Sequence, residues 1–174
     1  IAKVIGASDR AITSGFNAFK PAFGRGEVLE WQQGDKRVNF QILLVKNPAG
    51  MSLNLDLLTN VDSLKIIFAI NDNIADSKDV SWLWDSEFEL LNRTTIDWVM
   101  CTGIRAKDMT VRLKYAMADF DAMGPVQTQE DIRQTIEAAA ERVEDGETIY
   151  VLPTYTAMLE FRKIMGKSLE SSDL

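Results

Sequence analysis

The hydrophobic pattern of this chain alternates between two periods. Short apolar runs, such as residues 64–70 (LKIIFAI), have the length and β-branched content of buried strands. Between these runs, apolar residues recur three or four positions apart, as Met109, Leu113 and Met117 do, which is typical of helices. Strands are predicted at residues 28–32, 37–46, 64–70, 96–101 and 148–152, and helices at residues 4–19, 52–58, 106–117, 128–143 and 156–165. Strands that alternate with helices predict an α/β fold with a mostly parallel sheet and helices on both of its faces.

Two local patterns add detail to this outline. Residues 33–36 separate the first two strands, and their Gly-Asp pair predicts a hairpin turn. In the helix predicted at residues 52–58, Leu53, Leu57 and Leu58 share one apolar face.

A domain boundary is predicted near residue 24. Residues 22–27 contain glycines on both sides of Arg25, a composition typical of a hinge or linker. Residues 1–23 would then hold the last helix of a preceding domain and the linker, and residues 24–174 would form one domain with a full core. Because the sequence starts at Ile1 and not at a methionine, we expect an excised fragment or a processed product.

An acid-rich segment follows the apolar strand at residues 64–70. This segment is NDNIADSKDVSWLWDSEFE, residues 71–89, and it also contains two tryptophans. Open α/β sheets place their sites at the carboxyl ends of strands, so we expect a site here. The carboxylates that fall within fourteen positions are Asp72, Asp76, Asp79 and Asp85.

The spacing of these carboxylates leaves a structural and a functional interpretation open. Asp72, Asp76 and Asp79 are four and three positions apart, which does not match the alternating ligands of a calcium loop. In the structural interpretation, which composition alone favours, Asp72 forms a turn and Asp79 caps a short helix at residues 80–84. In the functional interpretation, the same carboxylates take part in catalysis or hold a metal ion.

Other side chains near this edge also have two possible roles. Trp82 and Trp84 would diverge by about 200° in a helix, so one should pack inward while the other faces a partner. Asn47 and Arg105 follow predicted strands. Arg105 can hold a phosphate or carboxylate in a forked grip, or it can pair with Asp108 three positions on.

Composition excludes several classes of function. A net charge of −7, a pI near 4.7 and the lack of a basic stripe argue against binding to nucleic acid or to anionic membranes. With Cys101 alone and no histidine, this chain can form neither a disulfide nor a thiolate or histidine metal site, nor a complete Ser-His-Asp site. No metal site is therefore expected in it. No apolar run approaches the ~20 residues of a membrane span, so we expect no transmembrane segment and a cytoplasmic location.

The triplet Gly166-Lys167-Ser168 invites comparison with a phosphate-binding loop. The first glycine of the motif GxxxxGK[ST] would fall on Phe161, and the triplet follows a predicted helix instead of a strand. Its N–H groups could therefore not form the nest that holds phosphates. If ATP is used, its main binding loop lies outside this chain.

Four segments resemble a known family. LLVKNPAG (43–50) resembles the strand ending in Asn-Pro in the C-terminal domains of Mur ligases and folylpolyglutamate synthases. NDNIADSKDVSWLWD (71–85), TGIRAKDMTVRLKYA (102–116) and LPTYTAML (152–159) are similar to the C-terminal domain of the MurT family, the Mur-ligase-like subunits of lipid II isoglutaminyl synthase. The similarity spans residues 20–165.

This resemblance implies a Rossmann-like Mur ligase C-terminal domain, and it also implies an activity. The family amidates the α-carboxyl group of the D-glutamate in lipid II, using ATP and ammonia that a partner glutamine amidotransferase, GatD, makes from glutamine. ATP and Mg²⁺ would be bound mainly by an upstream central domain, and the full-length family member carries zinc, whose cysteines are missing here. This chain alone is therefore expected to be inactive. Through lipid II, the protein would work at the inner face of the membrane.

The resemblance also suggests roles for single residues. The partner carries a cysteine and a histidine, and an aspartate of the MurT-type domain completes the triad. We expect this aspartate to be Asp79, with Asp76, then Asp72, then Asp85 as alternatives. The residues expected at the substrate or nucleotide edge are Asn47, Arg25 and Arg105, and those expected to contact the partner are Trp82, Trp84 and Asp85.

Two positions depart from the family pattern. Ser77 stands where the family commonly has glycine, which puts the turn next to Asp79 in question. Lys46 stands where many Mur ligases have histidine, although lysine agrees with the MurT type. Two other functions stay open: a domain that docks a partner without contributing to catalysis, and part of another ATP-dependent amide ligase such as folylpolyglutamate synthase.

Overall fold

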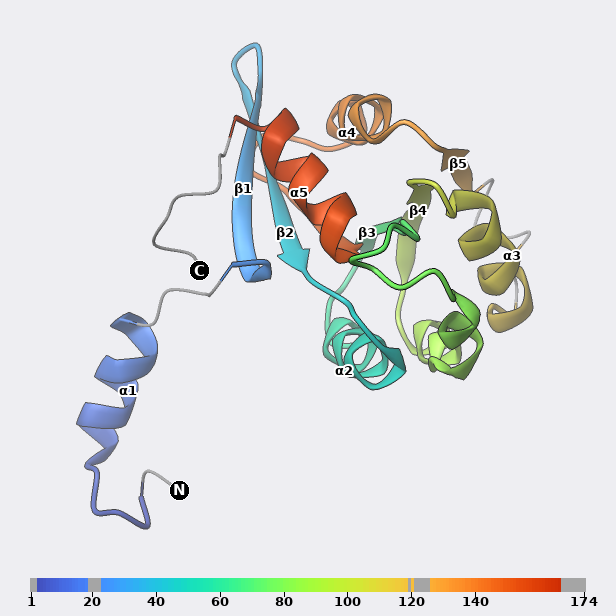
Figure 1. Cartoon of the computed structure of the whole chain (residues 1–174). Coiled ribbons are helices and arrows are strands. Elements are labelled where there is room, and N and C mark those ends of the chain that lie inside the picture. Colours follow the sequence, from blue (N-terminus) through green and yellow to red (C-terminus); the bar gives the residue numbers. More distant parts are fainter. Residues whose placement is uncertain (1–2, 19–22, 119, 121–125, 167–174) are drawn as a thin grey trace.

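The structure is a computed structural model that describes residues 3–18, 23–118, 120 and 126–166. It forms an α/β domain around one sheet, with helix α1 (Asp9–Ala18) lying apart from the layered body (Figure 1). The strands are β1 (Arg25–Gln33), β2 (Lys36–Leu43), β3 (Leu64–Ala69), β4 (Ile96–Thr102), β5 (Gln127–Gln129) and β6 (Thr148–Pro153). The helices that follow α1 are α2 (Pro48–Leu58), α3 (Ala106–Ala116), α4 (Ile132–Glu141) and α5 (Tyr155–Ile164), and two 3₁₀ segments are η1 (Ser81–Asp85) and η2 (Phe88–Arg93).

The sheet has the order β1-β2-β6-β3-β4-β5. Strands β1 and β2 are antiparallel and form the expected hairpin, in which Gln33 pairs with Lys36 around a turn that places Gly34 at φ 62°. The other four neighbouring pairs are parallel. The mixed, mostly parallel sheet of the sequence prediction is therefore confirmed.

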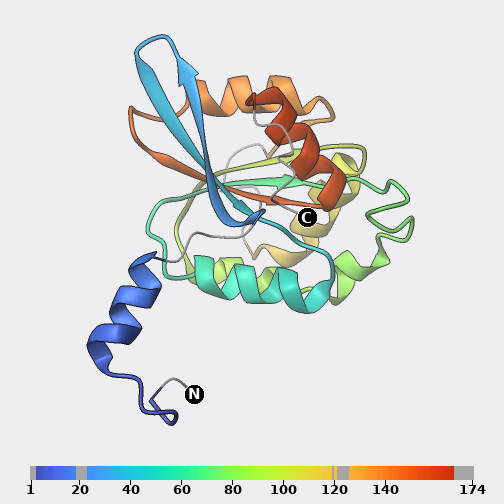
Figure 2. The same ribbon diagram turned by 60° about the vertical axis from the view of Figure 1, so that its left-hand side comes forward.

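Helices cover both faces of the sheet, as expected. Helices α4 and α5 lie on one face and α2 lies on the other, together with α3 and the 3₁₀ segments (Figure 2). Each face has its own core, because the side chains of the central strands point alternately to the two sides. In β3, for example, Ile66 and Phe68 join the core under α2 and α3, whereas Ile67 joins the core under α4 and α5.

Helix α2 buries a different face from the one that the sequence suggested. Leu53 and Leu57 are 67% and 64% exposed, and the buried residues are Met51, Leu55 and Leu58. The helix starts at Pro48, one turn before the prediction, and its cap Asn47 accepts a hydrogen bond from the Gly50 N–H (2.8 Å). This extra turn adds Met51, which lies four positions before Leu55 and joins it on the buried face. Because leucines occur all around α2, hydrophobicity alone did not distinguish its two faces.

The helix predicted at residues 128–143 is shorter than expected. Residues Gln127–Gln129 form strand β5, in which Gln127 pairs with Met100 of β4. Helix α4 begins only at Ile132, where the Asp131 carboxylate accepts a hydrogen bond from the Gln134 N–H (3.0 Å). A strand of three residues is too short to show an alternating pattern in the sequence.

The N-terminal helix also begins later than predicted. Residues 3–6 form a turn, and α1 runs from Asp9 to Ala18. Its assignment to a preceding domain stays a prediction. Among the described residues, no helix is long and apolar enough to cross a membrane. Lys167 and Ser168 of the rejected phosphate-loop triplet lie outside the described residues.

Candidate functional site at the carboxyl edge of the sheet

Three parallel strands are tied together at their carboxyl ends by Asn71, which follows β3. The Asn71 side chain is buried, and its Oδ1 accepts a hydrogen bond from the Ile104 N–H beyond β4 (2.9 Å). Its backbone N–H donates to Thr154 Oγ1 beyond β6 (3.0 Å). Gly103 approaches so closely that a Cβ there would lie 2.7 Å from Asn71 Oδ1. Sequence reasoning did not single out Asn71; the only signal was a polar residue directly after a buried strand.

The acid-rich segment then folds onto the start of α5 through Asp76. This side chain is 9% exposed, and its Oδ1 accepts a hydrogen bond from the Thr156 N–H (2.8 Å) while its Oδ2 accepts one from Thr156 Oγ1. Asp76 therefore caps a helix that begins almost eighty positions later in the chain. Neither of its carboxylate oxygens is free of a partner.

Ser77 follows with φ 84°, a conformation that favours glycine. Serine adopts the left-handed conformation that a glycine would adopt without strain.

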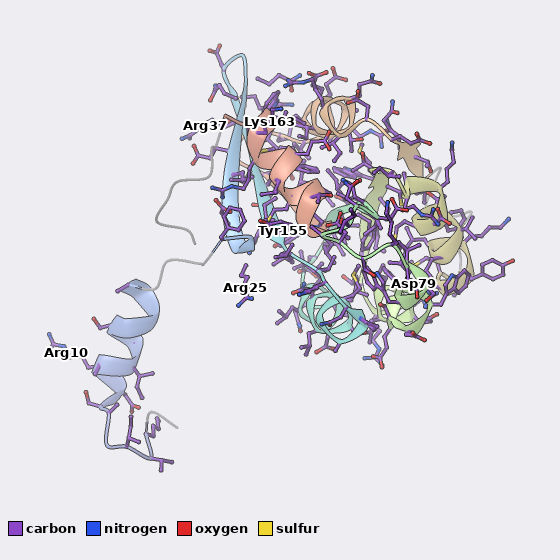
Figure 3. All side chains as sticks on the ribbon, viewed as in Figure 1. Arg10, Arg25, Arg37, Asp79, Tyr155 and Lys163 are labelled. Carbon is purple, nitrogen blue, oxygen red and sulfur yellow. The ribbon has the colours of Figure 1, made fainter. Side chains whose placement is uncertain are left out.

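Asp79 is exposed, unlike Asp76, and it lies beside the helical segment that follows β3 (Figure 3). Its Oδ1 accepts a hydrogen bond from the Ser81 N–H at the start of η1 (2.8 Å). The backbone and side-chain hydrogen bonds from Ser81 lower the pKa of Asp79 below its ordinary value. Asp79 is thus held in one place and is negatively charged at neutral pH. Asp79 is not the helix cap that the sequence suggested: Val80 precedes η1 without a side-chain capping bond, and Asp79 instead closes a tight turn by accepting from Ser81 two positions on.

An open pocket of about 490 Å³ lies next to Asp79, and its walls come from η1 and α3. Arg105 lines this pocket together with Asp108, and the two side chains pair (Nη2 to Oδ1, 3.1 Å). Arg105 Nη1 also lies 3.8 Å from the carboxylate of Asp72. Of the two alternatives that the sequence left open, the structure shows the pairing with Asp108. The guanidinium remains one-third exposed and faces the pocket of Asp79.

The two tryptophans of η1 diverge as predicted. Trp82 packs against the hydrophobic core, whereas Trp84 is 54% exposed and lines the same pocket as Asp79. The Trp84 ring contacts the ring of Tyr115 on α3 (5.7 Å between centroids). Asp85, the last residue of η1, is exposed. An exposed aromatic surface therefore borders the carboxylate of Asp79.

Segment η1 is held against α3 by Arg112, whose side chain is buried. Arg112 donates hydrogen bonds to the backbone oxygens of Leu83 (3.0 Å) and Ser86 (2.8 Å) and to the carboxylate of Glu89 (2.9 Å). Its guanidinium also lies 5.4 Å from the centroid of the Trp84 ring. Sequence reasoning missed Arg112, because nothing in the pattern distinguishes it from a solvent-exposed helical arginine.

Arg25 belongs to a different pocket. It lies at the base of β1, away from Asp79 (Figure 3), and lines a pocket of about 350 Å³ together with Lys46, Asp76 and Tyr155. Asn47 follows β2 at this edge, with its side chain engaged in capping α2. Within the part of the chain that the structure describes, the carboxyl edge thus carries at least two pockets. Asp79, Arg105 and Trp84 line one of them, and Arg25 lines the other.

The family model described as "MurT ligase C-terminal" matches residues 44–158 of this chain. The chain belongs to the MurT ligase C-terminal family. The matched range contains both pockets except for Arg25.

Two curated relatives of this MurT-type domain are enzyme subunits that are longer than this chain. The lipid II isoglutaminyl synthase (glutamine-hydrolyzing) subunit MurT of Streptococcus pneumoniae (strain ATCC BAA-255 / R6) is 32% identical over 168 residues, covering 95% of this chain and 35% of the relative. The same subunit of Staphylococcus aureus (strain COL) is 28% identical over 171 residues, covering 98% of this chain and 37% of the relative. The chain thus spans little more than a third of the length of these relatives.

Solved structures share the fold of this MurT-type domain at low sequence identity. Folylpolyglutamate synthase of Mycobacterium tuberculosis, complexed with ADP and AMPPCP, matches with a TM-score of 0.55 and 18% identity, over 97% of this chain and 38% of the other. MurF of Acinetobacter baumannii matches with a TM-score of 0.53 and 13% identity, over 95% of this chain and 35% of the other. These likenesses confirm the Mur-ligase-type fold predicted from the sequence.

Proposed function

We propose that this chain is the C-terminal part of an ATP-dependent ligase subunit that converts the D-glutamate of lipid II to D-isoglutamine. The ammonia would come from a GatD-like glutamine amidotransferase docked on this domain. The family match and the names of the relatives support the ligase family and the glutamine-dependent reaction. Because the chain spans about a third of those relatives, the complete activity belongs to the complete subunit, and this domain alone is expected to be inactive.

The exposed carboxylate of Asp79 is the observation that carries the proposal. A triad needs an ionised carboxylate that a partner's histidine can reach, because this group fixes the imidazole tautomer and stabilises the imidazolium. Asp79 offers such a group: it is exposed, its pKa is lowered, and it borders a pocket with an aromatic rim. A chain without histidine cannot supply the base of such a triad, but it can supply the carboxylate.

The other aspartates are less suited to this task. Both oxygens of Asp76 accept hydrogen bonds from Thr156. The Asp72 side chain is 19% exposed and lies near Arg105. Asp85 is exposed at the end of η1 and borders Trp84 in sequence, so we propose it as a partner contact together with Trp84.

ATP and Mg²⁺ would be bound mainly by parts of the ligase outside this chain. Within the chain, the pocket lined by Arg25 and Lys46 fits an anionic group. It offers too few contacts to bind a whole nucleotide. We propose that these two cations contact a phosphate or carboxylate of the nucleotide or substrate. The zinc of the full-length family member would also lie outside this chain. The lipid substrate would bring the enzyme to the inner face of the membrane.

Glutamine hydrolysis by the complex of ligase subunit and amidotransferase tests the proposal. We expect Asp79→Asn to bind the amidotransferase normally and to lower glutamine hydrolysis at least about a hundredfold, because the histidine loses its orienting charge. Asp56→Asn, which changes an exposed carboxylate on α2, serves as the matched control and should retain full activity.

Two outcomes would contradict parts of this assignment. Full activity of Asp79→Asn, with loss of activity in Asp76→Asn, would move the triad role to Asp76. In the second outcome, the four variants Asp72→Asn, Asp76→Asn, Asp79→Asn and Asp85→Asn all bind the amidotransferase and hydrolyse glutamine at the full rate. In that case the domain serves docking only. Binding is measured separately by calorimetry, so that a lost interface is not mistaken for a lost triad.

A further inference from the structure

A network of four polar side chains joins the Asp79 segment to α5. Thr156 Oγ1 accepts hydrogen bonds from Asn71 Nδ2 (3.1 Å) and from Asn73 Nδ2 (2.8 Å), and it donates its proton to Asp76 Oδ2. A hydroxyl group has one proton and two lone pairs, and all three are used here. We call Asn71, Asn73, Asp76 and Thr156 the clasp.

In the clasp, the donor and the acceptor of each hydrogen bond are fixed. Both lone pairs of Thr156 Oγ1 accept from amide groups, so its proton can only point to Asp76. Asp76 Oδ1 accepts from the Thr156 N–H at the same time. Both oxygens of Asp76 are therefore acceptors, a role that a carboxylate can fill and that an asparagine cannot, since an asparagine presents only one acceptor oxygen.

The position of Asp79 depends on this clasp. Only Ser77 and Lys78 separate Asp76 from Asp79, and Ser77 is held in a conformation with positive φ. On the other side, Asp79 is bonded to Ser81, the first residue of η1, which Arg112 ties to α3. Residues 77–80 therefore connect α5, through Asp76, with η1 and α3, through Ser81 and Arg112. These two attachments fix the path of the backbone between them.

We propose that Asp76 and Thr156 are positioning residues that hold Asp79 where a partner's histidine can reach it. This inference rests on the proposed role of Asp79. Losing the clasp would free one end of the 77–80 segment and displace the Asp79 carboxylate. Displacements of about 1 Å in a catalytic group can cost about a hundredfold in rate.

The test uses the full ligase subunit in complex with its amidotransferase. Thr156→Val keeps the shape of the side chain and removes the hydroxyl, and Thr156→Ser restores the hydroxyl. We expect Thr156→Val to lower kcat for glutamine hydrolysis by about tenfold or more with little change in KM, because glutamine binds to the partner. Thr156→Ser should recover most of the rate. Asp76→Asn should resemble Thr156→Val, and the double variant should be no slower than either single one.

A second readout separates positioning from general damage. Free ammonia can replace the partner's product, so ammonia-dependent amidation should stay within about twofold of wild type in Thr156→Val. Thr135→Val is the matched control, because it removes a buried hydroxyl on α4 that bonds Thr102 and Asp131. It should leave both rates unchanged.

The outcomes distinguish this inference from the proposed function. If Asp79→Asn abolishes glutamine hydrolysis and Thr156→Val leaves it unchanged, the clasp has no positioning role while the triad assignment stands. Equal loss of the glutamine- and ammonia-dependent rates in Thr156→Val would also overturn the inference, since that result indicates general damage. If Asp79→Asn has no effect, the proposed triad role of Asp79 fails, and this inference fails with it.

Discussion

At the scale of single residues, two aspartates of the candidate site have different surroundings although their side chains are identical. Asp76 and Asp79 are three positions apart, and one caps a distant helix while the other is exposed beside a pocket. Their sequence context did not separate these roles, because the partner that decides them, Thr156, lies far along the chain. Asp79 could be predicted as a candidate from the sequence. That Asp76, and not Asp79, bonds to α5 could not be predicted.

Ser77 provides a prediction at this scale. Its φ of 84° strains a side chain that carries a Cβ atom. We expect Ser77→Gly to raise the free energy of unfolding by up to about 1 kcal/mol, since the relief of strain exceeds the added entropy of the unfolded chain. Urea denaturation measures the change. Ser77→Ala retains the Cβ atom and should bring no gain, and a gain as large as that of glycine would contradict the strain argument.

At the scale of elements, the 3₁₀ segment η1 shows how a short helix is stabilised from outside. Five residues form few internal hydrogen bonds, and the bonds from Arg112 to the backbone oxygens of Leu83 and Ser86 hold η1 to α3. Sequence patterns predicted the existence of the segment and the divergence of its tryptophans. They could not identify Arg112, because burial of an arginine depends on carbonyl groups that only the fold brings near it.

We predict that Arg112→Met lowers the free energy of unfolding by about 3 kcal/mol. The methionine fills much of the volume but leaves the two backbone oxygens without their donor, and such losses are large in buried sites. Thermal unfolding followed by tryptophan fluorescence measures the effect and also reports on the Trp84 environment. Arg133→Met, which changes an exposed arginine of α4, should stay within about 0.5 kcal/mol of wild type. An equally small effect at Arg112 would show that η1 does not depend on it.

At the scale of the whole molecule, the mostly parallel sheet has two edges that carry different features. The carboxyl edge carries both pockets. Near the other edge, Lys65 of β3 lies 3.2 Å from the carboxylate of Asp97 in β4 and 3.0 Å from that of Glu147 before β6. This ion cluster links three strands without contacting either pocket, so it should affect stability and not activity.

Lys65→Met should lower the free energy of unfolding by about 1 kcal/mol at pH 7, since the cation is largely buried between partly exposed partners. The bond from the Glu144 N–H and the contact with Lys65 lower the pKa of Glu147. A lowered pKa adds stability above the ordinary value of 4.5, and this stability is lost as the pH falls through the folded-state pKa.

The stability difference between wild type and Lys65→Met should therefore narrow as the pH falls below 4.5, which urea titrations at several pH values can measure. Lys107→Met, which breaks an exposed pair with Glu130, is the control and should leave the unfolding midpoint unchanged. A difference at Lys65 that does not vary with pH would indicate lost packing instead of lost charge pairing.

The sequence by itself determined the α/β class, the hairpin, the order of the main strands and helices, and which edge of the sheet carries the acid-rich segment. These features follow from periodicity and turn chemistry, which act over a few neighbouring residues. Only the tertiary structure decided which face α2 buries, that Gln127–Gln129 form an edge strand, and that Asp76 is buried while Asp79 is exposed. Each of these depends on contacts between residues distant in sequence, such as Asp76 with Thr156, and no local pattern records such a contact.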